Sequence, residues 1–201
     1  MEIEDDNIVV LGIPRGGVIT ADVVARKLSA KYFDIVIPRK LTDIDNKEQA
    51  IGAIMEDGTT YLDKEIIEEL SIPSDYIEKE KAYQIQEIKR RTSLYRREGL
   101  EYKIQGKVAI LVDDGAATGA TIIAAARWIK KNQNPKRLII AIPVAPKDTV
   151  KLLKNECDDI VVVTTSPSSS FRSVSQYYQV FDPVSDERVI EIMRSRGMII
   201  P

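Results

Sequence analysis

The sequence of 201 residues contains no histidine, and this absence excludes several kinds of active site. Serine-histidine-aspartate triads, zinc sites built from histidine and imidazole acid–base catalysis all need a side chain that the chain does not have. Any catalysis must therefore use carboxylates, lysine, arginine, tyrosine, backbone dipoles or a metal ion that arrives with a ligand.

Cysteine and long apolar runs are also scarce. Cys157 is the single cysteine, so an internal disulfide is excluded and a reducing compartment is favoured. Residues 1–7 are acidic and lack the apolar stretch of a signal peptide, and no apolar run reaches the length of a transmembrane helix. We therefore expect a cytoplasmic protein.

The composition is that of a globular protein, with 44% hydrophobic and 30% charged residues. The formal net charge of -2 argues against a general affinity for nucleic acids or membranes, so any site for a polyanion must be local. The length fits a single domain over residues 1–201.

Short apolar segments rich in β-branched residues alternate with helical segments. The predicted core strands are residues 8–13, 33–37, 108–112, 138–144 and 159–164. The predicted helices are residues 18–28, 120–131, 147–155 and a C-terminal helix over 185–196. This alternation predicts an α/β fold with a doubly wound, parallel, five-stranded sheet. A strand order of 2-1-3-4-5 would place a ligand crevice between the first and third strands.

The segment between the second and third strands, residues 41–107, is unusually long. Asp57-Gly58 between two apolar segments predicts a hairpin over residues 50–62, and residues 62–70 and 74–97 are predicted helices. A basic cluster near the end of the second helix is interpreted as a solvated face that complements the helix C-terminus, rather than a nucleic-acid patch. The cluster consists of Lys89, Arg90, Arg91, Arg96 and Arg97.

The most informative stretch runs from Val108 to Thr121, with the sequence VAILVDDGAATGAT. An apolar strand ends at Asp113 and Asp114, and a turn of small residues leads into a helix. Such a turn lets backbone N–H groups approach a ligand, and a helix N-terminus favours anions. Carboxylates beside a phosphate are reasonable when they face sugar hydroxyls or a metal ion. The motif therefore predicts a sugar phosphate ligand; the structural alternative is a plain strand-turn-helix whose acids cap the helix.

Two further loops carry features of anion sites. Gly16 and Gly17 after the first strand free the backbone to point N–H groups at an anion, and Arg15 adds a fixed charge. The second strand is followed by Arg39 and Lys40, a cation pair that suits a pyrophosphate. A tight strand-helix turn and a solvated basic pair are the structural alternatives.

The run from Val108 to Thr121 closely resembles the phosphoribosyl-pyrophosphate (PRPP) motif of type I phosphoribosyltransferases. With the segments LGIPRGG, PRKL, AIGA and EDG, it resembles a subgroup of bacterial and archaeal proteins known as predicted phosphoribosyltransferases, over residues 8 to 178. This resemblance implies a pentosyltransferase of nucleotide salvage. Such an enzyme moves 5-phosphoribose from magnesium-bound PRPP to a nitrogen acceptor, usually a nucleobase, and releases pyrophosphate.

The resemblance also implies roles for particular residues. Asp113 and Asp114 would act in catalysis by holding the ribose diol and, through water and substrate, Mg²⁺. The 5′-phosphate would bind Gly115, Ala116, Ala117, Thr118, Gly119, Ala120 and Thr121. The pyrophosphate would bind Arg15, Gly16, Gly17, Arg39 and Lys40.

The resemblance further implies a mobile catalytic flap over residues 41–61, part of the flap and helical insertion of residues 41–107. Glu48 is its candidate catalytic carboxylate, because Ala117 stands where several purine-specific members have an acid. Because the sequence begins close to the first strand, we expect the base-binding hood to come mainly from residues 166–184. There Phe171, Tyr177 and Tyr178 are candidates to stack on the base, with ordinary packing as the alternative.

Two other functions stay open from the sequence. The first is a non-catalytic regulator that senses PRPP or nucleotides on the same fold, and the second is a sugar-phosphate hydrolase. We expect PRPP and a small-molecule acceptor as partners, with no nucleic acid or membrane, and the sequence leaves a homodimer open.

Overall fold

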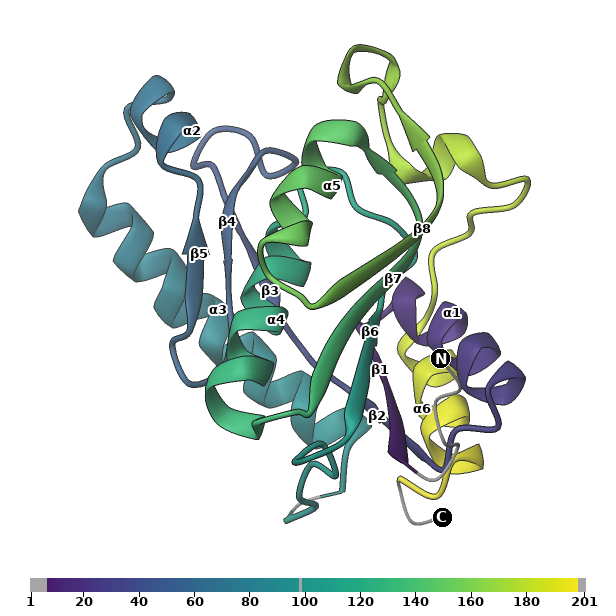
Figure 1. Ribbon diagram of the computed structural model, residues 1–201. Coiled ribbons are helices and arrows are strands. Elements are labelled where there is room, and N and C mark those ends of the chain that lie inside the picture. Colours follow the sequence, from purple (N-terminus) through teal and green to yellow (C-terminus); the bar gives the residue numbers. More distant parts are fainter. Residues whose placement is uncertain (1–6, 98, 199–201) are drawn as a thin grey trace.

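The computed structural model describes residues 7–97 and 99–198, so the expectation about the first six residues lies outside the described part. A parallel sheet of five strands, in the order β2-β1-β6-β7-β8, forms the centre of the molecule (Figure 1). The strands are β1 (Ile8–Gly12), β2 (Tyr32–Ile35), β6 (Val108–Val112), β7 (Arg137–Pro146) and β8 (Asp159–Ser166). The predicted fold class is therefore confirmed, and the observed order is the one for which we expected a crevice between the first and third core strands.

Helices cover both faces of this sheet (Figure 1). The helices of one apolar core are α1 (Gly16–Lys27), α3 (Ser74–Tyr95) and α6 (Asp186–Ser195). Those of the other core are α4 (Ala120–Gln133) and α5 (Lys147–Lys154). Because each strand sends alternate residues to the two cores, Val10 joins the first core whereas Val9 and Leu11 join the second. Burial on both faces explains why the strands are continuously apolar in sequence.

The loops that follow β1 and β6 lie next to each other. The two strands are parallel neighbours, and Gly12 at the end of β1 pairs with Val112 at the end of β6. β2 pairs with the opposite side of β1, so the strand order reverses between β1 and β6. A reversal of this kind creates the crevice in which open α/β sheets bind ligands.

A second, antiparallel sheet is built from the insertion. Its strands, in spatial order, are β3 (Arg39–Thr42), β4 (Ala50–Ile54) and β5 (Thr60–Leu62). The predicted hairpin is confirmed as β4 and β5, and Gly58 at its tip adopts the left-handed region with φ +84°. β3 was not predicted, because a four-residue segment that begins with two cations lacks the apolar pattern of a strand.

The second sheet limits the predicted flap. Every residue of β4 is buried, and β4 packs against both α3 and α4. A Cβ atom on Gly52 would lie 2.2 Å from the backbone oxygen of Tyr61, so the two strands are closely apposed. The flap prediction is now limited to the connection 43–49, which is largely exposed.

Arg96 corrects the interpretation of the basic cluster as a solvated face. It follows α3, is 8% exposed, and donates from Nε and Nη2 to the two carboxylate oxygens of Asp34, each at 2.8 Å. Its guanidinium carbon lies 3.8 Å from the ring centre of Tyr102. Arg90 and Arg91 both pair with Glu87, but only Arg90, with its side chain 55% exposed, lies on a solvated face as expected, because the Arg91 side chain is 15% exposed. The remaining helix of the insertion, α2, spans Lys64–Glu69.

Across the described ranges, no helix combines the length and the apolar composition needed to cross a bilayer.

Candidate active site

Asp113 and Asp114 stand at the end of β6, on the edge where the strand order reverses. Asp113 is 8% exposed, and its Oδ1 accepts a hydrogen bond of 2.9 Å from the Asp114 backbone N–H. Helix α4 begins after Gly119, which has φ +77°, and the N–H of its first residue, Ala120, donates to Thr118 Oγ1 at 3.4 Å rather than to either acid. The structural alternative, in which the two acids cap this helix, is therefore wrong.

The glycines after β1 lie directly against these acids. A Cβ atom on Gly16 would lie 1.8 Å from Asp114 Oδ2, and one on Gly17 would lie 2.6 Å from Asp113 Oδ1 and 2.8 Å from Asp113 Cα. The backbone N–H of Ile13 donates to the Val112 oxygen at 2.9 Å and joins the two loops. Two loops that are about a hundred residues apart in sequence thus form one surface.

The acid pair is electrostatically unusual. Burial, and then the charge of Asp114, raises the pKa of Asp113 well above its usual range. Burial also raises the pKa of Asp114. Neither carboxylate has an ion pair with a described lysine or arginine. Perturbed carboxyl groups at the mouth of a crevice mark a functional site, because the fold by itself does not offset their charge.

The turn after the acids supplies backbone donors, but fewer than the sequence predicts. The Ala116 N–H donates to the Val144 oxygen at 2.9 Å, so it cannot bind a phosphate, and this corrects the prediction for Ala116. Ala117, Thr118 and Gly119 differ, since none of their N–H groups has a partner among the described residues. Ala117 and Thr118 are also exposed. The Gly115 N–H also lacks a partner among the described residues, so within residues 115–119 the N–H of Ala116 is the one that is already engaged.

Helix α5 packs against this turn. Thr149 Oγ1 donates to the Ala117 oxygen at 2.6 Å. A Cβ atom on Gly119 would lie 3.0 Å from Thr149 Cγ2 and 3.2 Å from Leu153 Cδ2. Sequence reasoning missed Thr149, and no local pattern could have indicated it, because the contact joins two separate strand-helix units.

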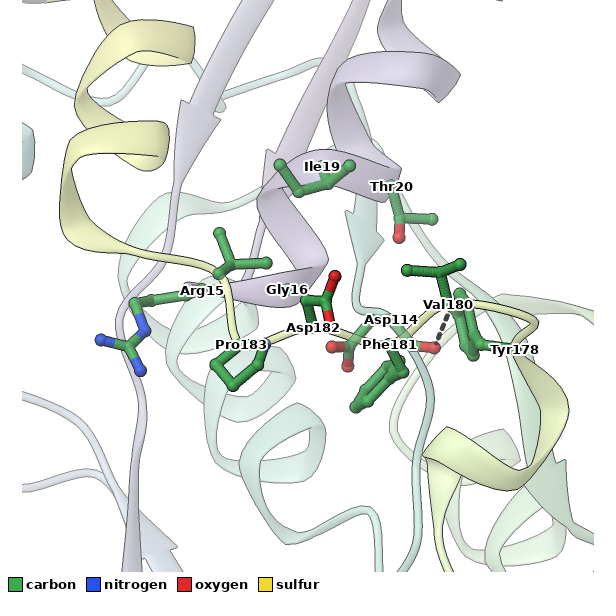
Figure 2. A pocket seen from close by; sticks show the side chains of 11 residues that line it. Arg15, Gly16, Ile19, Thr20, Asp114, Tyr178, Val180, Phe181, Asp182 and Pro183 are labelled. Carbon is green, nitrogen blue, oxygen red and sulfur yellow. Dashed lines mark hydrogen bonds between the residues drawn. The ribbon is translucent and has the colours of Figure 1, made fainter.

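Arg15 is held by the C-terminal helix. Its Nη1 lies 3.3 Å from Asp186 Oδ1, with the Arg15 side chain 40% exposed. Asp186 also accepts a hydrogen bond from the hydroxyl of Tyr95 at the end of α3. The peptide bond between Pro14 and Arg15 is cis. The guanidinium lies at the opposite side of the site from Tyr178 (Figure 2).

Arg39 and Lys40 are adjacent residues of β3, so their side chains point to opposite faces of this strand. Arg39 Nε donates to Gln84 Oε1 of α3 at 2.8 Å. Lys40 is exposed, and its cross-strand partner Ala53 belongs to the core that contains α4. Directly opposed residues share a face, so Lys40 lies on the α4 side and Arg39 on the α3 side. The two cations cannot act as one unit from one face.

Glu48 lies on the exposed connection 43–49, where its backbone N–H donates to Asn46 Oδ1 at 3.0 Å. It does not line the cavity that contains Asp114. The structure thus does not bring Glu48 to the acid pair.

The hood residues separate into two aromatic pairs. Phe171 and Tyr177 stack on each other with ring centres 5.5 Å apart, and neither lines the cavity with Asp114. Tyr178 does line it, and its hydroxyl donates to the Asp114 backbone oxygen at 2.6 Å (Figure 2). The partner ring of Tyr178 is Phe181, at 4.9 Å, which the sequence reasoning missed.

A cavity of about 490 Å³ lies between the start of α1 and the hood. Figure 2 shows the side chains that surround it. They belong to Arg15, Gly16, Ile19, Thr20, Asp114, Tyr178, Val180, Phe181, Asp182, Pro183 and Val184. This size suits a small organic ligand.

The acid pair has the donor chemistry that Mg²⁺ prefers. Magnesium is bound through one or two carboxylates, while water and substrate phosphates fill its other positions. Asp113 and Asp114 provide two adjacent carboxylates without a competing cation. Within residues 7–97 and 99–198, no group of three or more acidic or sulfur ligands is placed to hold a metal.

The fold and site define a class of proteins in which a doubly wound sheet ends in an acid pair followed by a turn, residues 115–119, with free backbone N–H groups. Residues 39–177 match the family described as the phosphoribosyl transferase domain, and the chain belongs to this family. The family prediction is thereby confirmed. The match begins at Arg39 and therefore does not include the loop after β1. We assign this loop to the site because Gly16 and Gly17 lie against Asp114 and Asp113.

Relatives of known sequence and structure agree with this membership. "Putative phosphoribosyl transferase Rv0571c" and "Putative phosphoribosyl transferase MT0597", from two strains of Mycobacterium tuberculosis, are each 33% identical over 186 residues. The alignment covers 92% of this chain but 41% of each relative, so the chain spans less than half of their length. The crystal structure of TT1426 from Thermus thermophilus is 36% identical, has a TM-score of 0.73, and is covered over 88% of its chain and 96% of this one.

Proposed function

We propose that the protein transfers 5-phosphoribose from magnesium-bound PRPP to a nitrogen acceptor, a nucleobase, and releases pyrophosphate. The observation that carries this proposal is the contact between the acid pair and the glycines after β1. Gly16 and Gly17 lie against Asp114 and Asp113, so a diol-binding pair is enclosed by two backbone loops suited to anions. A ribose that carries a phosphate at one end and a pyrophosphate at the other matches this arrangement.

The 5′-phosphate is assigned to the turn before α4. The free N–H groups of Ala117, Thr118 and Gly119 would donate to it, and the Thr118 and Thr121 hydroxyls would add donors. The N–H groups of Gly115 and Ala120, at the two ends of the turn, would donate to it as well, and the positive end of α4 favours the anion.

The pyrophosphate is assigned to the loop after β1. The backbone of Gly16 and Gly17 would bind it at the start of α1, with Arg15 beside them. Lys40 is the second cation that we place at this end, and Arg39 supports it through the docking of β3 on α3.

Breaking the bond between ribose C1 and the pyrophosphate oxygen builds positive charge on the ribose. The leaving oxygen takes the electron pair, and the acceptor nitrogen then bonds to C1. Bound Mg²⁺ would neutralise charge on the pyrophosphate. Asp114, at the crevice, would stabilise the ribose cation, and Asp113 would hold the diol.

The remaining candidate residues have proposed roles around the acceptor. Glu48 would take the proton from the acceptor nitrogen when the connection 43–49 closes over the cavity. Tyr178 would face the base, whereas Phe171 and Tyr177 would brace the hood through their stacked rings. Enclosure of this kind excludes water from the reacting atoms.

The deciding experiment measures pyrophosphate release from PRPP and MgCl₂ with a panel of purines, pyrimidines and other nitrogen heterocycles. We expect release that depends on one acceptor class and is abolished by Asp114→Asn. PRPP binding without release for any acceptor would indicate a regulator, and phosphate release without an acceptor would indicate a hydrolase. Calorimetry should also show that a nucleoside 5′-monophosphate binds more tightly than the matching nucleoside, because the phosphate turn contributes only to the former.

A further inference from the structure

The charges around the cavity are unevenly balanced. Its charged lining groups are Arg15, Asp114 and Asp182. Arg15 is already paired with Asp186 of α6. The Asp182 carboxylate, in contrast, is exposed at the cavity and has no hydrogen bond or ion pair with any residue in the described ranges, so a ligand can reach it directly. Figure 2 shows the Asp114 and Asp182 side chains projecting into the same space.

The wall next to Asp182 is aromatic and apolar. Phe181 is 42% exposed, and its ring packs at 52° to that of Tyr178. Val180 and Pro183 extend the same wall. An exposed ring face suits a planar heterocycle, whereas a nearby free carboxylate suits a hydrogen-bond donor at the edge of that heterocycle.

We propose that Asp182 selects the acceptor: the base presents N–H groups or a positive charge to this carboxylate, and heterocycles that carry a carboxylate of their own are rejected. The inference rests on the proposed function and names the acceptor class of the same site. An amino group would donate to the Asp182 carboxylate in place of water. A carboxylate on the acceptor would face Asp182 and Asp114, and the guanidinium of Arg15, which is paired with Asp186, is assigned to the pyrophosphate rather than to the base.

A matched series of nucleotides tests the base pocket without knowledge of the natural acceptor. Cytidine, uridine and orotidine 5′-monophosphates share the ribose and the phosphate, so the phosphate turn contributes equally to their binding. Cytosine has an amino group where uracil has an oxygen, and orotate adds a carboxylate to the uracil ring. By calorimetry we expect affinity to fall in that order, with about tenfold or more between the first and the last.

Two variants test whether Asp182 causes this order of affinities. Asp182→Asn keeps the shape and removes the charge, and we expect it to narrow the ratio between cytidine and orotidine monophosphates by about tenfold. Glu187→Gln removes the same charge from an exposed carboxylate five residues away that does not line the cavity. It should leave the ratio unchanged. Magnesium-bound PRPP should bind all three proteins equally well, which also shows that each variant is folded.

The outcomes separate this inference from the proposed function. Equal affinity for the three nucleotides in the unmodified protein, or an unchanged ratio in Asp182→Asn, overturns the inference and leaves the proposed function standing. A loss of PRPP affinity in Asp182→Asn places this carboxylate at the pyrophosphate or its metal, and also overturns the inference. If no nucleotide binds more tightly than its nucleoside, the proposed function fails and the inference fails with it.

Discussion

Two carboxylates are buried at the parallel sheet, and their surroundings are opposite. Asp34 lies within β2, is 2% exposed, and receives two hydrogen bonds of 2.8 Å from Arg96. Asp113 follows β6, is 8% exposed, and has Asp114 as its charged neighbour. Burial raises the pKa of both carboxyl groups, but Arg96 opposes this rise at Asp34, whereas the charge of Asp114 adds to it at Asp113.

This difference separates a structural charge from a functional one. A buried charge is costly unless it is paired, and Arg96 offsets the charge of Asp34 without any ligand. The charge of Asp113 is offset only when a proton, a metal ion or a sugar hydroxyl joins the pair. We infer that the fold tolerates this unfavourable placement because a ligand compensates it, as is common at functional sites.

The largest expected effect is the loss of stability when Asp34 loses Arg96, its ion-pair partner. Arg96→Met should lower the free energy of unfolding by about 3–5 kcal/mol, because it leaves Asp34 buried and unpaired. Urea denaturation measures this loss. PRPP binding by the folded fraction should be unchanged, since Arg96 and Asp34 lie outside the cavity with Asp114.

The double variant Asp34→Leu with Arg96→Met is the matched control. It removes both charges, so most of the lost stability should return. A double variant as unstable as Arg96→Met alone would mean that packing against Tyr102, rather than the charge of Asp34, accounts for the loss.

The next effect concerns the glycines that touch the functional carboxylates. A methyl group at position 17 would lie 2.8 Å from the Asp113 backbone, which cannot move aside easily, so Gly17→Ala should destabilise by about 1–3 kcal/mol and abolish PRPP binding. Gly16→Ala meets the end of the Asp114 side chain, which can rotate, and should lose ligand binding with less destabilisation. Thermal unfolding and calorimetry compare the two. Equal, small effects would show that the loops are not in close contact.

The third effect is the pH dependence of stability. Because the folded pKa of Asp113 is raised above the ordinary value of 3.8, the folded state binds its proton more tightly than the unfolded state does. The free energy of unfolding should therefore fall as pH rises from about 4 toward the raised pKa, by at most about 1.4 kcal/mol per pH unit. Asp113→Asn should reduce this fall, to which Asp34 and Asp114 still contribute because burial raises their pKa values as well, and it should be more stable near neutral pH while PRPP-dependent turnover is lost.

Urea denaturation at a series of pH values between about 4 and 8 checks this prediction. Asp114→Asn serves as the comparison: it removes the neighbouring charge that raises the pKa of Asp113, so it should reduce the fall without abolishing it. An unchanged pH profile in Asp113→Asn would show that Asp113 is not the group responsible.

The comparison also shows which parts of the molecule were predictable from sequence. The core strands, their alternation with helices and the Asp113–Asp114 turn depend on local patterns: apolar strands, small residues and a helix start. The pairing of Asp34 with Arg96 joins residues 62 apart, and the bond that removes the Ala116 N–H from the phosphate turn comes from Val144 on β7. Such contacts depend on tertiary packing, which no local pattern encodes. Phe181 was missed for the same reason, because its role follows from its contact with Tyr178.

The smallest expected effect separates Arg39 from Lys40, the cation pair that the sequence treats as equivalent. Both follow β2, yet β3 directs them to opposite faces, with Arg39 bonded to Gln84 and Lys40 exposed on the α4 side. Lys40→Gln should therefore weaken PRPP binding by roughly tenfold and nucleoside monophosphate binding only slightly, since only the pyrophosphate would reach it. Arg39→Gln should instead lower stability modestly, through the lost contact between β3 and α3, with little change in PRPP affinity. Calorimetry with both ligands measures the change in affinity, and urea denaturation of both variants measures the change in stability. Equal losses of PRPP affinity would mean that the two cations reach the pyrophosphate together around the edge of β3, and equal losses for PRPP and monophosphate would mean that they act through the general field of the site.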